Sequence, residues 1–166
     1  MPIRRWLSCL PALLSGPVAL AAQPVTVGWI ERVRLGSEGV VVAAKLDTGA
    51  DTSSLYARDL RWHGREDGEW VEFEVAGSNG EITRFERKVV RITRVKRASG
   101  AAERRPTVHM GICLGGVYRD AEVNLTDRSA FNYELLVGRR FLANYFRVDP
   151  ALVYTVEPRC AQAPPR

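Results

Sequence analysis

The chain has few of the side chains that bind metal ions, with two histidines, His63 and His109, and three cysteines among 166 residues. A zinc site needs three or four histidine, cysteine or carboxylate ligands in close array, and no His-Glu-x-x-His motif is present. His109 and Cys113 lie four positions apart, which on a strand separates them by more than ~12 Å unless the chain turns at Gly111. A glycine-rich phosphate-binding loop is also missing. We therefore predict no metal and no cofactor.

Long apolar runs are equally scarce. The stretch from Trp6 to Leu20 is shorter than the roughly 20 residues that a bilayer-spanning helix needs. A basic start with Arg4 and Arg5 precedes it, and small residues at 19–22 follow it, which is the pattern of a secretory signal peptide. The sequence therefore predicts a signal peptide over residues 1–22, a periplasmic or secreted protein and no membrane span.

Charge and cysteine content limit the possible partners. The chain has 24 Lys and Arg against 19 Asp and Glu, a formal charge of +5, but the arginines occur mainly singly. Without an aromatic and basic platform we predict no nucleic-acid partner. One domain over residues 23–157 and a disordered tail over residues 158–166 follow from length and composition. An oxidising compartment would permit a bridge between Cys113 and Cys160, which the sequence leaves open.

Alternation of apolar and polar residues predicts an all-β domain of the barrel kind. Glycine-containing turns at 36–39, 77–80 and 115–116 separate the expected strands. A short helix is expected near the C-terminal end, at 138–145. The expected strands cover residues 29–33, 40–46, 69–75, 81–95, 107–114, 117–125 and 135–137.

The most informative motif is an apolar strand over residues 40–46 that delivers Asp47 into a Thr48-Gly49 turn. A buried carboxylate must be paired, hydrogen-bonded or protonated, and catalysis is one reason to keep it there. An ordinary Asx-type turn is the other interpretation of the tripeptide.

A second segment favours the catalytic interpretation of Asp47 over the ordinary turn. Residues 135–137 are apolar and are followed by Gly138, Arg139 and an apolar helical turn. Together with Asp-Thr-Gly-Ala-Asp at 47–51, this combination resembles the retropepsin-like aspartic proteases. Further stretches resemble a bacterial branch of that superfamily labelled ATP-dependent zinc proteases. Those stretches are 27–31, 52–55, 70–75, 125–129 and 148–150.

The resemblance implies a site and a fold, a retropepsin-like acid-protease barrel with one short C-terminal helix. Two carboxylates must share a proton in this chemistry, and the chain supplies one, so the resemblance implies a homodimer with one Asp47 from each subunit. The implied catalytic residues are Asp47, Thr48 and Gly49. Ala50, Asp51, Gly138 and Arg139 would support them, with Asp51 paired to Arg139. The best candidate for a flap over the substrate is the turn Gly77, Ser78, Asn79 and Gly80.

We therefore expect an exported aspartic endopeptidase that hydrolyses peptide bonds of cell-envelope peptides or proteins. One alternative is a non-catalytic module that binds a peptide or protein on the same fold. A metal-dependent peptidase is the other. Neither the substrate nor the optimum pH can be read from the residues.

Overall fold

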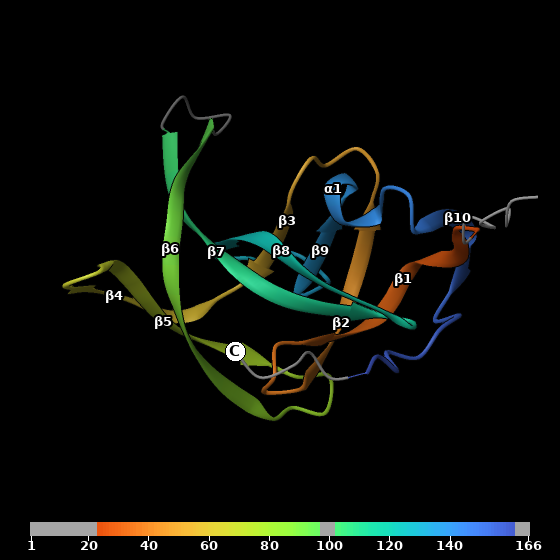
Figure 1. Ribbon diagram of the computed structural model, residues 1–166, viewed down its shortest axis with the longest axis horizontal. Helices are drawn as coiled ribbons and strands as arrows, with labels where there is room; N and C mark the ends of the chain where they lie inside the picture. The colour runs from red at the N-terminus through yellow and green to blue at the C-terminus, as the bar shows by residue number, and fades with distance from the viewer. Residues whose placement is uncertain (1–22, 97–101, 162–166) are drawn as a thin grey trace, which may run out of the picture.

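The computed structural model describes residues 23–96 and 102–161. Strands dominate this part of the chain, and one short helix, α1, accompanies them (Figure 1). The strands are β1 (Val25–Leu35), β2 (Val40–Asp47), β3 (Ser53–Tyr56), β4 (Arg58–Arg65), β5 (Gly68–Ala76), β6 (Ile82–Lys96), β7 (Ala102–Leu114), β8 (Val117–Thr126), β9 (Leu135–Gly138) and β10 (Phe146–Val153), and the helix is α1 (Arg139–Leu142).

All ten strands form one mixed sheet in the order β10-β1-β2-β9-β3-β8-β7-β6-β5-β4. The end of β1 also pairs with β7, with Val33 opposite Leu114, so the sheet curls back on itself. The prediction of an all-β fold with one short C-terminal helix is confirmed. The helix covers only Arg139–Leu142, because Ala143 already has an extended backbone.

Strand β2 shows why this sequence folds as it does. Buried and half-buried residues alternate along it, so Val42, Ala44 and Leu46 point into the core. On the other side of the core, Phe73 of β5 and Phe85 of β6 stack with their ring centres 5.5 Å apart. Burial of these apolar faces stabilises the closed sheet and fixes the strand ends that carry the polar residues.

The C-terminal segment after β10 is tied to β1 by a buried carboxylate. Glu31 has no exposed surface, and its Oε1 accepts hydrogen bonds from Gly28 N at 2.7 Å and Thr155 N at 2.9 Å. The Thr155 hydroxyl also donates to Oε1, and Val156 N donates to Oε2 at 3.2 Å. The Glu31 carboxylate therefore accepts hydrogen bonds from backbone N–H groups of β1 and of the segment after β10.

A disulfide between Cys113 of β7 and Cys160 fixes the chain beyond that point. Arg34 adds a hydrogen bond from Nη2 to the Cys160 carbonyl oxygen at 3.0 Å. The question that the sequence left open is thus answered in favour of the bridge. Among residues 23–96 and 102–161 no helix is long and apolar enough to cross a bilayer.

Candidate functional site

The turn between β2 and β3 is built around the side chain of Asp47, the last residue of β2. Its Oδ1 accepts hydrogen bonds from Gly49 N at 3.0 Å and Ala50 N at 3.2 Å, and its carbonyl oxygen accepts one from Ala50 N at 3.3 Å. Thr48 and Gly49 are exposed at the tip. The carboxylate therefore shapes the turn through its own backbone, as an Asx-type turn does.

The second carboxylate oxygen of Asp47 is held by a cation. Lys45 Nζ lies 3.3 Å from Oδ2, because residues two apart on a strand share a face. Burial raises the pKa of Asp47, but the hydrogen bonds from Lys45, Gly49 and Ala50 and the Lys45 charge outweigh it, so the pKa is lowered. The group is thus an ionised carboxylate with both oxygens occupied.

Strand β9 and helix α1 hold the turn from the other side. Asp47 lies opposite Gly138 in the parallel β2–β9 pairing, and Arg139 N donates to Ala50 O at 2.7 Å. A Cβ on Gly138 would lie 2.5 Å from the carbonyl carbon of Thr52, so only glycine fits here. The sequence predicted these two segments as partners, and the structure brings them into contact.

Asp51 contacts two arginines of α1. Its Oδ1 lies 3.3 Å from Arg139 Nη2, and its Oδ2 lies 2.8 Å from Arg140 Nη2. All three side chains are more than half exposed, at 51%, 55% and 67%. Exposed pairs of this kind contribute at most about 1 kcal/mol, so backbone hydrogen bonds fix the turn more firmly than the ion pairs do. Sequence reasoning missed Arg140 because it considered only the residue directly after Gly138.

A chain of polar side chains connects the end of the turn to the β6–β7 hairpin. Thr52 Oγ1 accepts a hydrogen bond from Asn124 Nδ2 at 3.0 Å, and Asn124 Oδ1 accepts bonds from Thr107 and Thr93 at 2.7 and 3.0 Å. In Figure 1 this hairpin rises on the same side of the molecule as α1 and the β2–β3 turn. These contacts couple the turn to β6, β7 and β8.

Two arginines, Arg105 and Arg128, lie beside β3, just beyond the turn. Arg128 belongs to the 125–129 stretch that resembled the bacterial branch, but the sequence assigned neither arginine a role in a site. Arg128 is only 7% exposed, and its Nη1 donates to Ser54 Oγ of β3 at 2.8 Å. Arg105 Nη2 lies 2.8 Å from Glu103 Oε2, and its Nε is a buried N–H group for which the described residues provide no acceptor. This "arginine cluster", Arg105 and Arg128, is an unusual concentration of positive charge in a partly buried place.

Burial lowers the pKa of the Arg128 guanidinium, the Arg105 charge lowers it further and Glu134 acts in the opposite direction. Within residues 23–96 and 102–161, no carboxylate comes within ion-pair distance of Arg128. The sequence signals for Arg128 were its place in the 125–129 stretch and its position soon after a strand, and neither predicted a buried side chain. Such residues are ordinarily exposed.

The glycine turn that was the flap candidate lies elsewhere on the chain. Ser78 N donates to the carbonyl oxygen of Val41, at the start of β2, whereas Asp47 ends that strand about 20 Å away. Gly77, Ser78, Asn79 and Gly80 are therefore not brought together with the Asp47 turn of the same chain. Their role as a flap stays a prediction. In the described part of the chain, no three metal-binding side chains gather around a common point.

The lowered pKa of Asp47 gives a testable pH dependence of stability. A depressed carboxylate pKa stabilises the fold above the unfolded value near 3.8, and this contribution is lost as pH falls through the folded value. We expect Asp47→Asn to cost less than about 1 kcal/mol at pH 7, since Lys45 is 43% exposed, and still less at pH 3. Urea unfolding of both proteins between pH 3 and pH 7 measures the difference.

Asp149→Asn is the control for this experiment, because Asp149 also accepts a backbone N–H, from Ala151 at 2.9 Å. The described residues place no cation within ion-pair distance of it. Asp149→Asn therefore measures the loss of a carboxylate acceptor for a backbone N–H without the loss of an ion pair. An Asp47→Asn difference that stays constant from pH 3 to pH 7 would contradict the ion pair with Lys45.

Comparison with known proteins places this architecture in a family. The family model of the RimB-like proteins, described as "Retropepsin-like aspartic endopeptidase RimB", matches residues 26–159. A crystal structure of a protein of unknown function from Legionella pneumophila superposes with a TM-score of 0.67 at 34% identity, covering 80% of this chain and 98% of that one. The family description contains neither the ATP nor the zinc of the label that the sequence suggested.

Curated relatives point to a particular chemistry. A probable alpha-L-glutamate ligase of Shewanella pealeana is 37% identical over 113 residues, which are 66% of this chain and 25% of that protein. A protein of the same name from Desulfotalea psychrophila is 32% identical over 114 residues, again 25% of its length. The chain thus spans about a quarter of the curated relatives that it matches.

These names correct the expected activity. We expected an aspartic endopeptidase, or alternatively a metal-dependent peptidase, but the curated relatives are named for a ligase, an enzyme of a different class. The word endopeptidase in the family description does not outweigh them, and the hydrolase and protease assignments are wrong on this comparison. In the described chain, Lys45 and two backbone N–H groups already occupy the Asp47 carboxylate.

The family itself is shown by the match over residues 26–159 together with the Legionella structure. This chain therefore belongs to the RimB-like family and has the retropepsin-like fold.

Proposed function

We propose that this domain serves an alpha-L-glutamate ligase reaction by binding the glutamate-bearing peptide or protein segment. The names of four curated relatives support the reaction class. The observation that carries the proposal is the arginine cluster, a 7% exposed Arg128 beside an Arg105 whose buried Nε lacks an acceptor among the described residues. The ligand class is therefore a chain with several side-chain carboxylates.

Physical chemistry favours a carboxylate at this place. A buried cation without a counter-charge is costly, and a buried N–H without an acceptor costs about 1–3 kcal/mol. A guanidinium binds a carboxylate through two parallel N–H groups, which a neutral amide cannot match. A glutamate side chain would supply both the missing negative charge and the missing acceptor.

The arrangement around the cluster suits an extended peptide. Ser54, the hydroxyl partner of Arg128, belongs to β3, which begins two residues after Asp51. The ring of Phe131 lies 4.6 Å from the Arg128 guanidinium and is 62% exposed, so it marks the surface through which a ligand would approach. A peptide that lies along β3 would pass both the cluster and the Asp47 turn.

We expect a fluorescein-labelled hexaglutamate peptide to bind the purified chain at least about tenfold more tightly than the matching hexaglutamine peptide. Fluorescence anisotropy measures both affinities. Arg128→Gln and Arg105→Gln are each expected to weaken hexaglutamate binding by a similar factor, because each removes one carboxylate partner.

Arg94→Gln is the matched control, since Arg94 is an exposed arginine on β6 opposite Arg104 and outside the cluster. Its effect on the affinity is expected to stay within about threefold. Equal binding of the two peptides, or an equal loss in Arg94→Gln, would overturn the proposal. Circular dichroism of the Arg128 variant separates lost binding from lost folding, and Arg105→Gln gives a second test at a less buried side chain.

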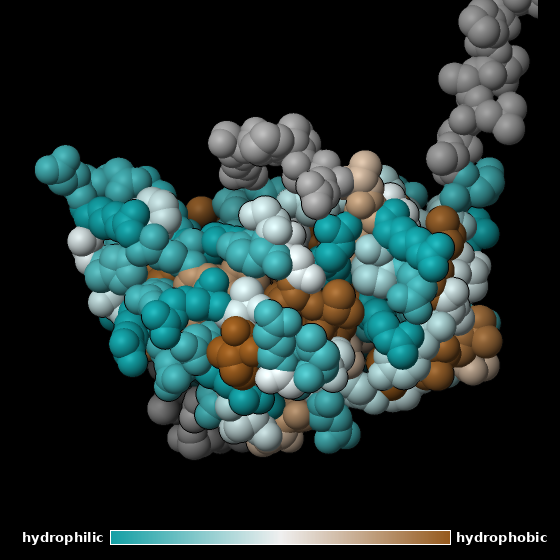
Figure 2. Space-filling view, turned by 90° about the horizontal axis from the view of Figure 1, so that it is seen from below, coloured by the Kyte–Doolittle hydropathy of each residue, from teal (hydrophilic) through white to brown (hydrophobic). Residues whose placement is uncertain are grey.

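We further propose that the chain forms a homodimer through the β10 edge. Strand β10 is an edge of the sheet. Its residues Leu152 and Val153 are 41% and 47% exposed, and Val25 of the neighbouring β1 is 46% exposed. Figure 2 shows apolar surface at the right-hand end, where Figure 1 places β1 and β10, and also in the middle of that face. Exposed apolar side chains on an unpaired edge favour association.

Light scattering of the native chain and of Val153→Lys tests this proposal. We expect a dimer for the native chain and a monomer for the variant.

We also propose that the protein is exported to the periplasm or secreted. The disulfide between Cys113 and Cys160 supports an oxidising compartment. The predicted signal peptide, residues 1–22, lies outside the described residues. Amino-terminal sequencing of protein recovered from cell fractions tests the proposal, with a start at Ala22 or Gln23 expected.

A further inference from the structure

A hollow of about 240 Å³ lies between α1, the start of β3 and the strands β7 and β8. It is separate from the arginine cluster. It is also smaller than the roughly 300–1,000 Å³ pockets that hold drug-sized ligands, so its natural occupant is a smaller molecule. Its lining consists of Thr52, Ser53, His109, Arg119, Asp120, Ala121, Glu122, Arg140 and Phe141.

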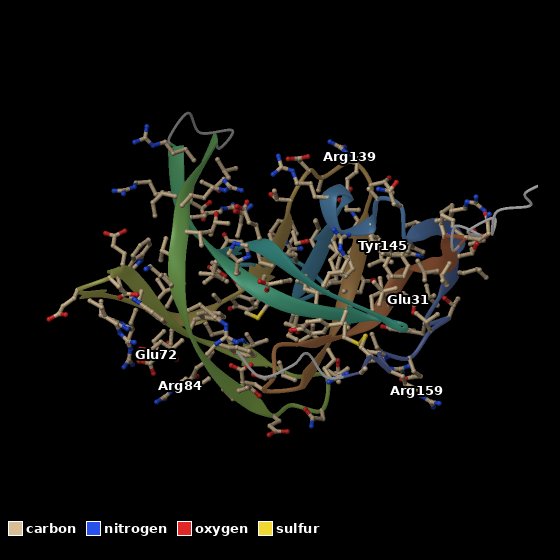
Figure 3. The ribbon with its side chains drawn as sticks, viewed as in Figure 1. Glu31, Glu72, Arg84, Arg139, Tyr145 and Arg159 are labelled. Atoms are coloured by element: carbon tan, nitrogen blue, oxygen red, sulfur yellow. A yellow bond between two sulfur atoms is a disulfide. The ribbon has the colours of Figure 1, made fainter. Side chains whose placement is uncertain are left out.

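Arg119 supplies the first positive charge of this hollow. Its Nη1 donates to the carbonyl oxygen of Phe141 at 2.8 Å, and its guanidinium lies 4.5 Å from the centre of the Tyr145 ring. These contacts hold the Arg119 side chain against α1 and Tyr145, and Tyr145 is labelled in Figure 3. In the part of the chain that the structure describes, Arg119 makes no ion pair, so its charge is available to an anion.

Arg140 supplies the second positive charge. Its Nη2 lies 2.8 Å from Asp51 Oδ2, and the side chain is 67% exposed. Because an exposed pair of this kind is weak, a ligand can compete for the guanidinium at little cost.

Two carboxylates belong to the same hollow. Glu122 accepts hydrogen bonds from Nε and Nη2 of Arg91 at 2.9 and 2.8 Å, and Asp120 Oδ2 lies 3.4 Å from His109 Nδ1. The hydrogen bond from Arg91 lowers the pKa of Glu122 against the effect of burial, and the charges of Arg91, His109 and Arg140 lower it further. Glu122 is therefore ionised and lies within electrostatic reach of Arg140.

We propose that this hollow binds a free α-amino acid as its zwitterion, with the carboxylate on Arg119 and Arg140 and the ammonium group toward Glu122 and Asp120. A dianion such as phosphate would meet two carboxylates, and a simple amine would meet two guanidiniums. A molecule whose ammonium and carboxylate groups are attached to the same carbon atom satisfies both sets of groups. The inference does not depend on the proposed binding of glutamate chains, because the two sites share no residue.

The test is isothermal titration calorimetry of the full chain with amino acids and with analogues that lack either the ammonium group or the carboxylate group. L-glutamate is compared with glutarate, which lacks the ammonium group, and L-alanine is compared with propionate and with ethylamine. We expect each amino acid to bind at least about tenfold more tightly than the analogues that lack one of its charged groups. Equal binding of glutarate and L-glutamate would overturn the proposal, and so would the lack of heat from every amino acid at millimolar concentration.

Variants test which side chains bind the carboxylate group of the ligand and which bind its ammonium group. Arg119→Gln is expected to weaken all carboxylate ligands at least about tenfold, whereas Glu122→Gln is expected to remove the preference for L-glutamate over glutarate. Arg140→Gln replaces Arg119→Gln if the latter fails to fold, because its side chain is largely exposed. Unchanged affinities in both an arginine variant and Glu122→Gln would contradict the site.

Arg84→Gln and Glu72→Gln are the matched controls. They break an ion pair of 3.1 Å between β6 and β5, at the lower left of Figure 3 and away from Tyr145, and should leave both affinities unchanged. Arg128→Gln distinguishes this proposal from the preceding one. It should keep the affinity for free amino acids even where the binding of hexaglutamate is lost.

Discussion

Replacing Glu31 by alanine is expected to lower the free energy of unfolding by about 3–5 kcal/mol. The substitution would take the acceptor away from Thr155 N and Val156 N, whose hydrogen bonds are partly buried, at up to about 1–3 kcal/mol each, and would open a cavity at the fully buried Glu31 position. Gly28 N would keep only the Thr155 hydroxyl, at 3.2 Å. Urea unfolding followed by tryptophan fluorescence measures the loss.

Glu31→Gln tests the physical reason more finely. The glutamine side chain has nearly the same shape, but its NH₂ group would face an N–H donor where the carboxylate has an acceptor. We expect an intermediate cost of about 1–3 kcal/mol. The control is Glu157→Gln in the same segment, whose carboxylate is 53% exposed and pairs with Arg32 at 3.2 Å, and which should cost less than about 1 kcal/mol. If Glu31→Ala costs no more than this control, the buried carboxylate does not anchor the segment.

Loss of the Cys113–Cys160 disulfide should have an effect of similar size. The bridge closes a loop of 47 residues, for which chain entropy predicts about 4 kcal/mol of stabilisation. In a domain of this size, that corresponds to a fall in melting temperature of roughly 10 °C. Differential scanning calorimetry of the protein with both cysteines replaced by alanine, compared with the native chain, measures the effect.

Reduction of the native chain separates the effect of the disulfide on the melting temperature from the effect of replacing the packed cysteine side chains. Dithiothreitol should lower the melting temperature of the native chain nearly to that of the double variant and leave the variant unchanged. Cys113 is only 1% exposed, so its alanine replacement adds a small packing cost that reduction does not. A native chain that melts at the same temperature with and without reductant would show that the bridge does not stabilise the domain.

The strands that the sequence predicted are those with an alternating pattern and a buried face. Strands β3, β4 and β10 were not foreseen, because their own residues give a weak signal. Strand β4 reads Arg-Asp-Leu-Arg-Trp-His-Gly-Arg and is an edge strand held by β5, and β10 contains Pro150, which an edge strand tolerates. Pairing with distant strands, not local preference, determines these elements.

The candidate site was predictable to a similar extent. The Asp47 turn and the Gly138 segment were found because each carries a short motif. Lys45 could have been found, since a residue two positions before Asp47 on a strand lies on the same face. The positions of Arg128 beside β3, and of Arg119 and Glu122 beside α1, could not be predicted, because only the folded sheet brings these segments together. No residue pattern in the chain distinguished a ligase relative from a peptidase, and that correction came from the names of the relatives.

The parallel pairing of β2 with β9 has a consequence for biosynthesis. The turn is complete as a sequence once Asp51 has been made, but Arg139, which donates to Thr48 O, is 91 residues beyond that acceptor. At about 5–20 residues per second, a ribosome needs roughly 5–20 s to supply it. Throughout that interval the nascent Asp-Thr-Gly tip lacks β9, the strand that pairs with Asp47, so the geometry of this corner is among the last features of the protein to form.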